Sequence, residues 1–351
     1  MLLGKLFRPV RHDKEFRGLY STRQFLQAME RERARAERWG TTLALLSLGV
    51  EPSPAGRATL LQVAKLLRRR HGVTDETGWL CDGQIGVLMP NAPPWQAWNL
   101  ADDLCLALPE GVPMAECRVF AYPSRGRKTD LAQANESSPN LPQVEAMETL
   151  FLRPLPAWKR AVDIVGAVAA LILSSPVLLL AALTVKLTSR GPVLFHQLRG
   201  GIGGRPFVMH KFRTMVVDAE QRKESLRTLN EQDGPAFKLR NDPRVTRVGA
   251  FLRKFSIDEL PQLWNVLRGD MSLVGPRPLP CDESDACRGW HRQRLDVTPG
   301  LTCIWQVHGR GRVSFTEWIR MDLNYVRSRS PGRDLTLLLK TVWAVLFGRG
   351  T

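Results

Sequence analysis

The sequence predicts an α+β protein with two parts: a front module in which helices and strands alternate, and a mainly helical domain that opens with an apolar helix-break-helix. The chain has 351 residues, 44% of them hydrophobic, which is enough for two folded domains and excludes a largely disordered protein. Turn-forming residues are frequent between the two parts. We therefore expect a first domain over residues 17–123, a linker over 124–153 and a second domain over 154–351.

The positive charge of the chain is concentrated in its second part. Residues 1–150 contain 19 Lys and Arg against 17 Asp and Glu, whereas residues 151–351 contain 31 against 17. Such a basic domain can meet nucleic acid, an anionic membrane surface or phosphate-bearing substrates. The six cysteines form no CxxC pair, so we expect reduced thiols on the cytoplasmic side rather than a zinc cluster or a disulfide framework. The apolar run at the N-terminus is too short for a signal peptide, and we do not expect export.

Local signals in the front module alternate between helix and strand patterns. A charged amphipathic segment follows a capping residue at Ser21. Asp82-Gly83 separates two apolar runs, which is a strong signal for a β-hairpin. From these patterns we expect helices over residues 18–38, 59–70 and 94–107 and strands over residues 42–50, 79–81, 84–89 and 117–122.

This order of elements resembles the GGDEF domain of diguanylate cyclases over residues 17–123. The position of the family's signature is occupied by Cys81-Asp82-Gly83-Gln84-Ile85, which lacks the paired glycines and the acidic pair. Ser47-Leu48-Gly49-Val50-Glu51 stands at the end of the first strand, where the family has metal-binding aspartates. The resemblance therefore implies a degenerate GGDEF-like domain that does not cyclise nucleotides. Its role could be dimerisation, which would make the protein a homodimer, or regulation, or ligand sensing.

An apolar segment opens the second domain. Between Ile164 and Val185 the only polar side chains are two serines and a threonine, and a helix of that length matches a bilayer core of about 30 Å. Ser175-Pro176 lies in the middle, where proline removes a helical hydrogen bond, and Lys and Arg flank both ends. We therefore predict a re-entrant helix-break-helix over about residues 160–187, which enters the lipid bilayer and returns to the same side. A kinked single span and a soluble core helix are the alternatives.

Two adjacent carboxylates, Asp258 and Glu259, follow a serine that is a favourable helix N-cap. Ser256 and Glu259 have the spacing of a capping box, and the apolar residues after them recur at helical spacing. We therefore predict that a helix begins at Ser256. Amide groups at its N-terminus would favour the ionised form of Asp258, which could then bind a cation or attack phosphorus. The alternative is that both carboxylates serve only to cap the helix.

Cationic side chains surround this acidic pair in the sequence. Lys211 and Arg213 alternate along a predicted strand, so they should share one face and could bind a diphosphate or a lipid head group. The alternative for these two residues is a strand face that is only solvated. Arg244, Arg253 and Arg277 flank the carboxylates, and the planar guanidinium fork suits phosphate oxygens. The combination predicts a metal-assisted phosphate site.

The motifs of the second domain resemble, in the same order, those of the bacterial sugar transferases, which are monotopic polyprenyl-phosphate phosphoglycosyl transferases. The resemblance covers about residues 154–351. The motifs that carry it are Lys159-Arg160-Ala161-Val162-Asp163, Ser175-Pro176, Lys211-Phe212-Arg213-Thr214-Met215, Asp242-Pro243-Arg244-Val245-Thr246, Asp258-Glu259-Leu260-Pro261-Gln262, Val274-Gly275-Pro276-Arg277-Pro278 and Pro299-Gly300-Leu301-Thr302.

That resemblance implies transfer of a phosphosugar from a UDP-sugar to undecaprenyl phosphate, with release of UMP and a requirement for Mg²⁺, at the start of surface polysaccharide or glycoconjugate synthesis. Asp258 would be the nucleophile that carries a phosphosugar intermediate, and Glu259 would assist the metal or activate the lipid phosphate. Arg253 and Arg277 would bind phosphates, and Ser175-Pro176 would be the family's membrane break. The resemblance also implies a monotopic protein of the inner, cytoplasmic membrane whose catalytic domain faces the cytoplasm.

The C-terminal segment, residues 334–347, is mostly apolar and too short to span a bilayer comfortably. We expect an amphipathic helix in the membrane interface, with packing on the catalytic core as the alternative.

Two other classes of function fit parts of the sequence. The first is a membrane scaffold without enzymatic activity, in which the front module binds a nucleotide and the basic domain docks on lipid. The second is nucleic-acid binding, which has only the charge in its favour. Because a basic domain that begins with an apolar membrane segment suits anionic lipid better, we expect no nucleic-acid partner.

Overall fold

The computed structural model describes residues 16, 18–50, 53–70, 72, 74–108, 116–124, 143–239, 241–287, 289–308 and 313–346. The chain divides into two compact units, Met1–Phe151 and Leu152–Thr351.

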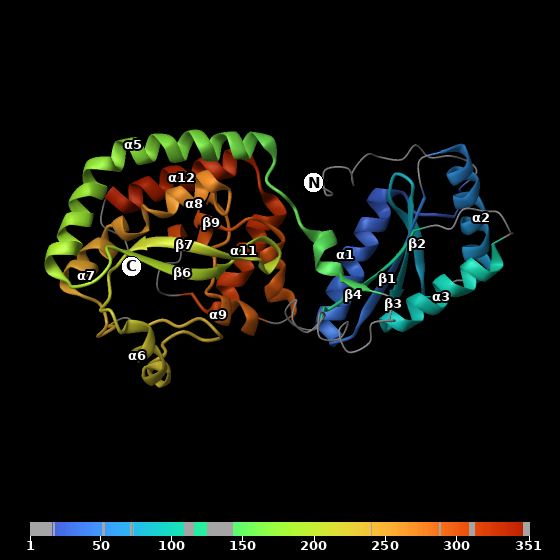
Figure 1. Ribbon diagram of the computed structural model, residues 1–351, viewed down its shortest axis with the longest axis horizontal. Helices are drawn as coiled ribbons and strands as arrows, with labels where there is room; N and C mark the ends of the chain where they lie inside the picture. The colour runs from blue at the N-terminus through green and yellow to red at the C-terminus, as the bar shows by residue number, and fades with distance from the viewer. Residues whose placement is uncertain are drawn as a thin grey trace. The chain divides into compact units, whose positions relative to one another are not determined.

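A five-stranded sheet in the order β2-β3-β1-β4-β5 forms the centre of the first unit (Figure 1). Its strands are β1 (Leu43–Gly49), β2 (Glu76–Cys81), β3 (Gln84–Pro90), β4 (Glu116–Tyr122) and β5 (Val144–Ala146). The first four pair antiparallel with their neighbours, and β5 adds to β4 in parallel. The chain order β-α-β-β-α-β is that of a ferredoxin-like unit, so the predicted alternation of helices and strands is confirmed.

Helices cover both faces of this sheet, which explains why β1 is buried along its whole length. Leu43 and Leu45 pack toward α1 (Thr22–Trp39), while the alternate residues of β1 pack toward α2 (Pro54–Arg70) and α3 (Pro94–Ala107). The predicted cap of α1 is confirmed, because Ser21 forms a capping box with Gln24.

The hairpin predicted at Asp82-Gly83 connects β2 to β3, and Gly83 has a φ of 75°. The first unit continues past residue 123. After β5, the 3-10 helix η2 (Met147–Phe151) buries Met147 and Phe151 in the same cluster as the inner face of α1. The predicted linker therefore ends earlier than residue 153, and its part over residues 125–142 lies outside the described residues.

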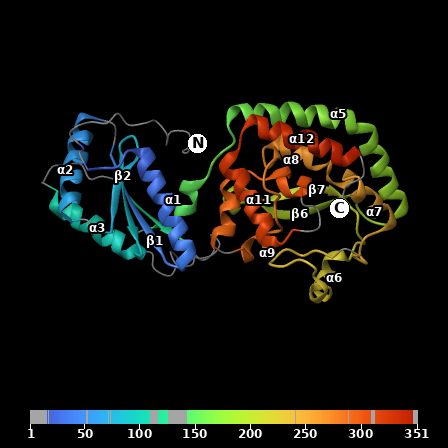
Figure 2. The ribbon, with the colours of Figure 1, turned by 180° about the vertical axis from the view of Figure 1, so that it is seen from behind.

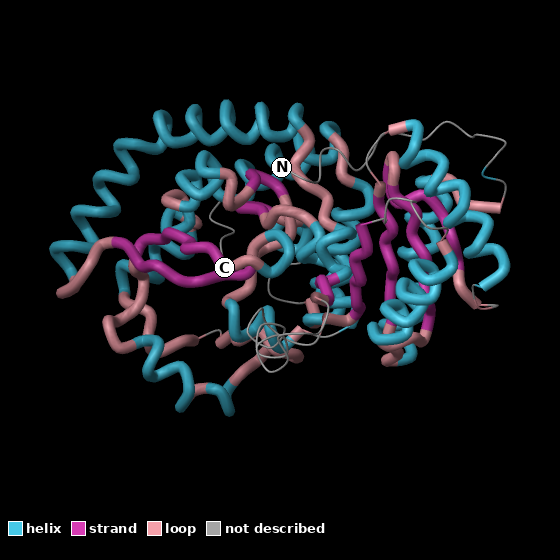
Figure 3. The backbone as a smooth tube through the Cα atoms, turned by 45° about the vertical axis from the view of Figure 1, so that its right-hand side comes forward, coloured by secondary structure: helices cyan, strands magenta, loops and turns pink. Residues whose placement is uncertain are grey.

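The second unit is mainly helical, with two small strand pairs. Its helices are α5 (Ala157–Thr188), α6 (Ala219–Ser225), α7 (Arg247–Lys254), α8 (Gln262–Arg268), α9 (Cys281–Ala286), α10 (Ile304–His308), α11 (Phe315–Ser328) and α12 (Pro331–Leu346). Its 3-10 segments are η3 (Ile202–Gly204), η4 (Arg227–Leu229), η5 (Ile257–Glu259) and η6 (Gly289–Asp296). The hairpin β6 (Leu194–Gly200) and β7 (Pro206–Phe212) is antiparallel, whereas β8 (Ser272–Val274) and β9 (Gly300–Thr302) pair in parallel (Figure 3).

Three polar residues in the first two turns of α5 attach this helix to the unit. Lys159 forms a buried ion pair of 2.5 Å with Asp334 of α12. Arg160 donates to the last carbonyls of α8, at Val266 and Leu267, which is a favourable place for a cation. Asp163 accepts hydrogen bonds from the Ser272 hydroxyl and the Leu273 amide of β8 at 3.0 and 2.9 Å.

Beyond these anchors, α5 turns apolar side chains outward. By length and composition, α5 is long and apolar enough to cross a membrane. Only 11% of its most apolar 18-residue stretch is buried within the protein. Leu173 and Leu187 are 81% and 75% exposed. This exposure excludes the alternative of a soluble core helix within the unit, because such a helix would be buried.

α5 remains helical through Pro176, and Figures 1 and 2 show it bending beyond its middle. Proline cannot donate a hydrogen bond to the carbonyl of Ile172, four residues before it. The hydroxyl of Ser175 donates to that oxygen instead, at 2.8 Å. The structure therefore has a bend where we predicted an interruption, and the re-entrant path through lipid stays a prediction.

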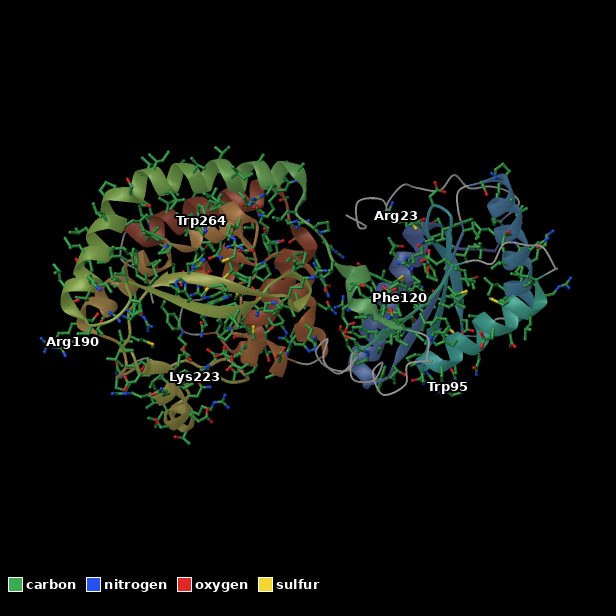
Figure 4. The ribbon with its side chains drawn as sticks, viewed as in Figure 1. Arg23, Trp95, Phe120, Arg190, Lys223 and Trp264 are labelled. Carbon is green, nitrogen blue, oxygen red and sulfur yellow. The ribbon has the colours of Figure 1, made fainter. Side chains whose placement is uncertain are left out.

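α12 is amphipathic in the expected way, and it also packs on the unit. Leu337 and Ala344 are buried. The opposite face exposes apolar side chains at helical spacing, namely Leu335, Leu339, Val342 and Trp343. α12 lies beside α5 and α8 in both ribbon views (Figures 1 and 2), and Trp264 of α8, labelled in Figure 4, is 55% exposed.

Candidate active site

The acidic pair lies on a tight turn between α7 and α8. Ser256 has a left-handed backbone with φ 55° and ψ 23°, and η5 follows directly. A left-handed conformation costs a non-glycine residue roughly 1–2 kcal/mol, so the surrounding structure must hold it in place. The α-helix begins at Gln262 and not at Ser256, as we had predicted.

The predicted capping box is also wrong. The side chain of Ser256 caps no helix, and the carboxylate of Glu259 is bound by Arg277. Arg277 Nη1 donates to Glu259 Oε2 at 3.2 Å, and Nη2 donates to Oε1. A two-pronged guanidinium bond is stronger than a bond to one backbone amide, which explains why it wins. Burial raises the pKa of Glu259, but the charge of Arg277 outweighs it and leaves that pKa well below its usual range.

Asp258 differs from its neighbour. Its side chain is buried, with 7% of the residue exposed, and none of the residues that the structure describes donates a hydrogen bond to its carboxylate. Burial, and to a smaller extent the negative charge of Glu259, raise the pKa of Asp258 above its ordinary value. The positive charges of Lys211 and Arg253 lower this pKa but do not cancel the rise. We had expected a helix N-terminus to favour the ionised form, so this expectation is wrong. Burial dominates because the turn provides no α-helical N-terminus at Asp258.

Lys211 of β7 is close enough to Glu259 and Asp258 for their charges to act on it, and no described residue forms a hydrogen bond or ion pair with its ammonium group. Burial and the charges of Arg199 and Arg277 lower the pKa of Lys211, while Glu259 and Asp258 oppose this shift. An anionic ligand placed among these groups would favour the protonated form.

Arg199 is the member of this cluster that sequence reasoning missed. It lies on β6, next to the strand of Lys211, and is held by the carbonyl of Pro278 and by Gln197 Oε1, the latter at 2.8 Å from Nη2. Burial and the charge of Arg277 lower its pKa to about 10. The sequence signal that could have identified it is the glycine-rich run over residues 200–204, which indicates a turn between two strands and would put Arg199 on the strand next to that of Lys211.

Arg253, at the end of α7, donates from Nε to the Thr214 hydroxyl at 2.9 Å. Burial lowers its pKa, and Asp258 is the strongest opposing charge, which places this guanidinium near the acidic pair. Thr214 is itself tied to α7, because its carbonyl accepts the amide of Thr246 at 3.0 Å.

The other two predicted phosphate ligands bind elsewhere. β7 ends at Phe212, so Arg213 does not share the face of Lys211. Its guanidinium donates to the carbonyls of Arg190 and Ser189 at 2.7 and 3.0 Å, just after the end of α5, where Figure 4 labels Arg190. Arg244 pairs with Asp242 at 2.7 Å and donates to the Ala219 carbonyl at 3.0 Å.

The structure therefore brings Asp258, Glu259, Lys211, Arg253 and Arg277 together and adds Arg199. One carboxylate is fixed by a guanidinium and the other has no hydrogen-bond donor among the described residues. A buried nucleophilic carboxylate among cations suits chemistry at phosphorus, because the cations offset the negative charge of a phosphate that it approaches.

Among proteins of known family, the chain resembles sugar transferases. It is 43% identical over 193 residues to the galactosyl transferase CpsE of Streptococcus agalactiae, which covers 55% of this chain and 43% of CpsE. It is 42% identical over 209 residues to the exopolysaccharide production protein ExoY of Rhizobium meliloti, covering 58% of this chain and 92% of ExoY. It is 46% identical over 198 residues to the UDP-glucose:undecaprenyl-phosphate glucose-1-phosphate transferase of Caulobacter vibrioides, covering 54% of this chain and 69% of that protein. The chain thus spans less than half the length of CpsE but most of ExoY.

Solved structures with some similarity include GGDEF domains. A DGC protein from Thermotoga maritima matches with 16% identity and a TM-score of 0.27, covering 36% of this chain and 98% of that one. The GGDEF domain of DgcB from Caulobacter crescentus matches with 13% identity and a TM-score of 0.28, covering 39% and 98%. These scores are too low to assign a role to the first unit.

A family model described as bacterial sugar transferase matches residues 155–348, which are more than half of the chain and include every residue of the site above. The chain therefore belongs to the bacterial sugar transferase family.

Proposed function

We propose that the protein transfers a phosphosugar from a UDP-sugar to undecaprenyl phosphate and so starts the synthesis of a surface polysaccharide or glycoconjugate. Relatives named for this class of reaction support the substrate classes. The observation that carries the proposal is the buried Asp258, with no hydrogen-bond donor among the described residues, beside a Glu259 that is fixed by Arg277.

In the first step, an oxygen of the Asp258 carboxylate attacks the β-phosphorus of the UDP-sugar. The bond between that phosphorus and the bridging oxygen breaks, UMP leaves with the bridging oxygen, and Asp258 carries the phosphosugar. In the second step, a phosphate oxygen of undecaprenyl phosphate attacks the same phosphorus, which forms the lipid diphosphate sugar and restores the carboxylate. Splitting the transfer in this way avoids bringing two large anions together directly.

The cations of the site have separate tasks in this scheme. Lys211, without a hydrogen-bond or ion-pair partner among the described residues, would bind the donor diphosphate, and the bound anion would favour its protonated form. Arg199 and Arg253 add fixed positive charge near the reacting phosphorus. Arg277 holds Glu259 still, so that Glu259 can accept a proton or a ligand only at a defined position.

Magnesium fits this donor set in part. Mg²⁺ commonly takes one or two carboxylates together with substrate phosphates and water. Asp258 is available as a ligand, whereas both oxygens of Glu259 are bonded to Arg277. Asp258 and the donor diphosphate would therefore hold the ion, with Glu259 beside it, and the bound Mg²⁺ would supply charge neutralisation at the phosphates.

The apolar outer faces of α5 and α12 suit a membrane surface, and so does Trp264. We propose that the protein sits on the inner membrane, that α5 enters the bilayer and returns at its bend, and that the catalytic unit faces the cytoplasm. This arrangement would place the site near the phosphate of a lipid acceptor.

The first unit would not cyclise nucleotides. At its hairpin, Gln84 lies against Gly49 at the end of β1, where an added Cβ would meet the Gln84 side chain at 3.3 Å, and Gln84 accepts from Cys81 Sγ at 3.1 Å. The Gln84 side chain therefore occupies the hairpin where the GGDEF signature would provide glycines and acidic residues. A regulatory or dimerising role is what we propose for it.

A UMP-release assay on the full chain tests the proposal, with undecaprenyl phosphate and a panel of UDP-sugars. We expect release that requires Mg²⁺ and falls by about 10³-fold or more in Asp258→Asn. The matched control is Asp218→Asn, at an exposed aspartate that pairs with Arg222 on the surface, and it should keep full activity. No release with any UDP-sugar, together with tight binding of a cyclic dinucleotide, would instead support the scaffold alternative.

A further inference from the structure

Two histidines face each other across the β6-β7 hairpin, outside the site described above. His196 and His210 are directly opposite in the register of the two strands. Their Nδ1 atoms are 2.8 Å apart, and their ring centroids are 4.9 Å apart at an interplanar angle of 89°. His196 is exposed and His210 is partly exposed, so solvent and dissolved ions reach the pair.

The backbone beneath the pair is held by a buried side chain of α8. Asn265 is fully buried, accepts the amide of His210 at 3.1 Å and donates to the carbonyl of Val208 at 2.7 Å. These bonds fix β7 against α8 at Val208 and at His210. The position of the His210 ring therefore does not depend on the hairpin alone, which reduces the cost of arranging the two rings for a ligand.

The contact between the two nitrogens has a chemical consequence. Only one of two hydrogen-bonded Nδ1 atoms can carry the shared proton, so the other offers a lone pair. Zinc binds imidazole nitrogen at about 2.0–2.1 Å, and two such bonds hold their nitrogens roughly 3 Å apart. The two Nδ1 atoms are already close to that separation.

We propose that His196 and His210 form a two-imidazole binding site for a divalent transition ion of the zinc, nickel and copper class. The ion bonds to both Nδ1 atoms after a small rotation of the rings. The proton that the two Nδ1 atoms shared moves through solvent to Nε2 of the ring that carried it, so both rings bind as neutral imidazoles. Among the described residues, no group of three or more His, Cys, Asp or Glu side chains gathers there, so water completes the coordination. Nitrogen ligands select these ions over Mg²⁺, which prefers oxygen.

A bound ion would connect the two strands that carry site residues. Arg199 follows His196 on β6, and Lys211 follows His210 on β7. The ion would therefore restrict the separation of these strands without touching the acidic pair. The site stands on the histidine geometry alone and does not depend on the proposed function.

Copper and nickel titrations of the full chain in detergent, without a polyhistidine tag and with millimolar Mg²⁺ present, test this site. We expect one Ni²⁺ per chain by calorimetry, and a Cu²⁺ electron paramagnetic resonance spectrum with splitting from two nitrogens. His196→Gln and His210→Gln should each weaken binding by at least about tenfold, because each removes a direct ligand. The matched control is His291→Gln, in the same unit but packed between Trp290 and Phe315, and it should leave the affinity unchanged.

Circular dichroism and thermal unfolding without metal show whether each variant is folded. Glutamine is chosen because it keeps a polar side chain that can form hydrogen bonds at these positions. The proposal is overturned if a folded double variant, which carries both His196→Gln and His210→Gln, binds Ni²⁺ and Cu²⁺ as tightly as the unmodified chain does. It is also overturned if only His291→Gln removes binding. Neither result concerns UMP release, so failure here and failure of the proposed function can be distinguished.

Discussion

Arg294 donates from Nη2 to the backbone carbonyl of Arg277, and the same guanidinium forms a buried pair with Asp322 of α11 at 2.8 Å. Arg277 in turn binds Glu259 through its side chain. A chain of contacts therefore connects α11 to the acidic pair. Arg294 and Asp322 are positioning residues in this account, because they act on the site through Arg277.

Asp322→Asn should destabilise the protein by about 3–5 kcal/mol, because it leaves the Arg294 charge buried without its counter-charge. Urea unfolding of the purified protein measures this. The matched control is Asp218→Asn, which breaks a surface pair with Arg222 and should cost at most about 1 kcal/mol. Equal midpoints for the two variants would show that the buried pair does not hold α11 in place.

Arg277→Lys keeps the charge at the site but removes the two-pronged bond to Glu259. We expect turnover to fall by roughly 10²-fold or more, with little change in the KM for the UDP-sugar, since Arg277 would act by fixing Glu259. Arg268→Lys, at a more exposed arginine that pairs with Asp270, is the control and should keep normal turnover. A rise in KM alone would mean that Arg277 binds the donor without ordering Glu259.

The raised pKa of Asp258 predicts how the rate depends on pH. Asp258 attacks as a carboxylate, so protonation stops the reaction, and the acid limb of the rate profile should lie above the pH at which an ordinary aspartate titrates. Glu259→Gln removes one of the charges that raise this pKa and should move the acid limb to lower pH. The profile of kcat/KM against pH measures both, because it reports the groups of the free enzyme. An unmoved or upward-shifted limb in Glu259→Gln would contradict the assignment.

The raised pKa of Asp258 also predicts that its ionised carboxylate lowers the stability of the folded protein. A carboxyl group whose pKa is raised in the folded state binds its proton more tightly when folded, so its ionisation destabilises the protein as pH rises through that pKa. At pH 8, the free energy of unfolding of Asp258→Asn, measured with urea, should therefore exceed that of the unmodified chain by about 0.5–2 kcal/mol. This difference should vanish in acid. A variant less stable than the parent at pH 8 would contradict this.

Gly249 permits the close approach that holds Arg253 in place. A Cβ at this position would lie 2.0 Å from the carbonyl oxygen of Thr214, which is backbone and cannot move aside easily. Gly249→Ala should therefore destabilise the protein by about 2 kcal/mol or more and lower activity by displacing Arg253 from Thr214. Gly332→Ala in α12 is the control, because nothing lies within 4 Å of its added Cβ, and it should be neutral or slightly stabilising.

Local signals predicted the elements whose partners are close in sequence. Ser21 and Gln24 form the cap of α1, and Asp82-Gly83 forms the hairpin turn, because each depends on only a few neighbouring residues. The acidic pair was found for a similar reason, since its two carboxylates are adjacent and arginines flank it in sequence. Its predicted cap failed because Arg277, eighteen residues away, binds Glu259 more strongly than the Ser256 amide could.

Which cationic side chains belong to the site could not be predicted without knowing where each strand ends. Lys211 and Arg213 alternate in sequence, but β7 stops between them and Arg213 binds the carbonyls that follow α5. Arg199 was missed because only the pairing of β6 with β7 puts it on the strand next to that of Lys211, where its charge acts on Lys211. Burial, which sets the pKa of Asp258, also comes from tertiary packing that a local pattern does not contain.

In the proposed reaction, Asp258 becomes covalently bonded to the phosphosugar. Mass spectrometry of proteolytic peptides, after incubation with Mg²⁺ and a UDP-sugar accepted in the UMP-release assay but without lipid acceptor, tests it most directly. We expect a phosphosugar adduct on the peptide that contains Asp258, formed together with UMP, lost on addition of undecaprenyl phosphate, and absent in Asp258→Asn. UMP release at the normal rate by Asp258→Asn, or normal turnover with no adduct before the lipid is added, would contradict it.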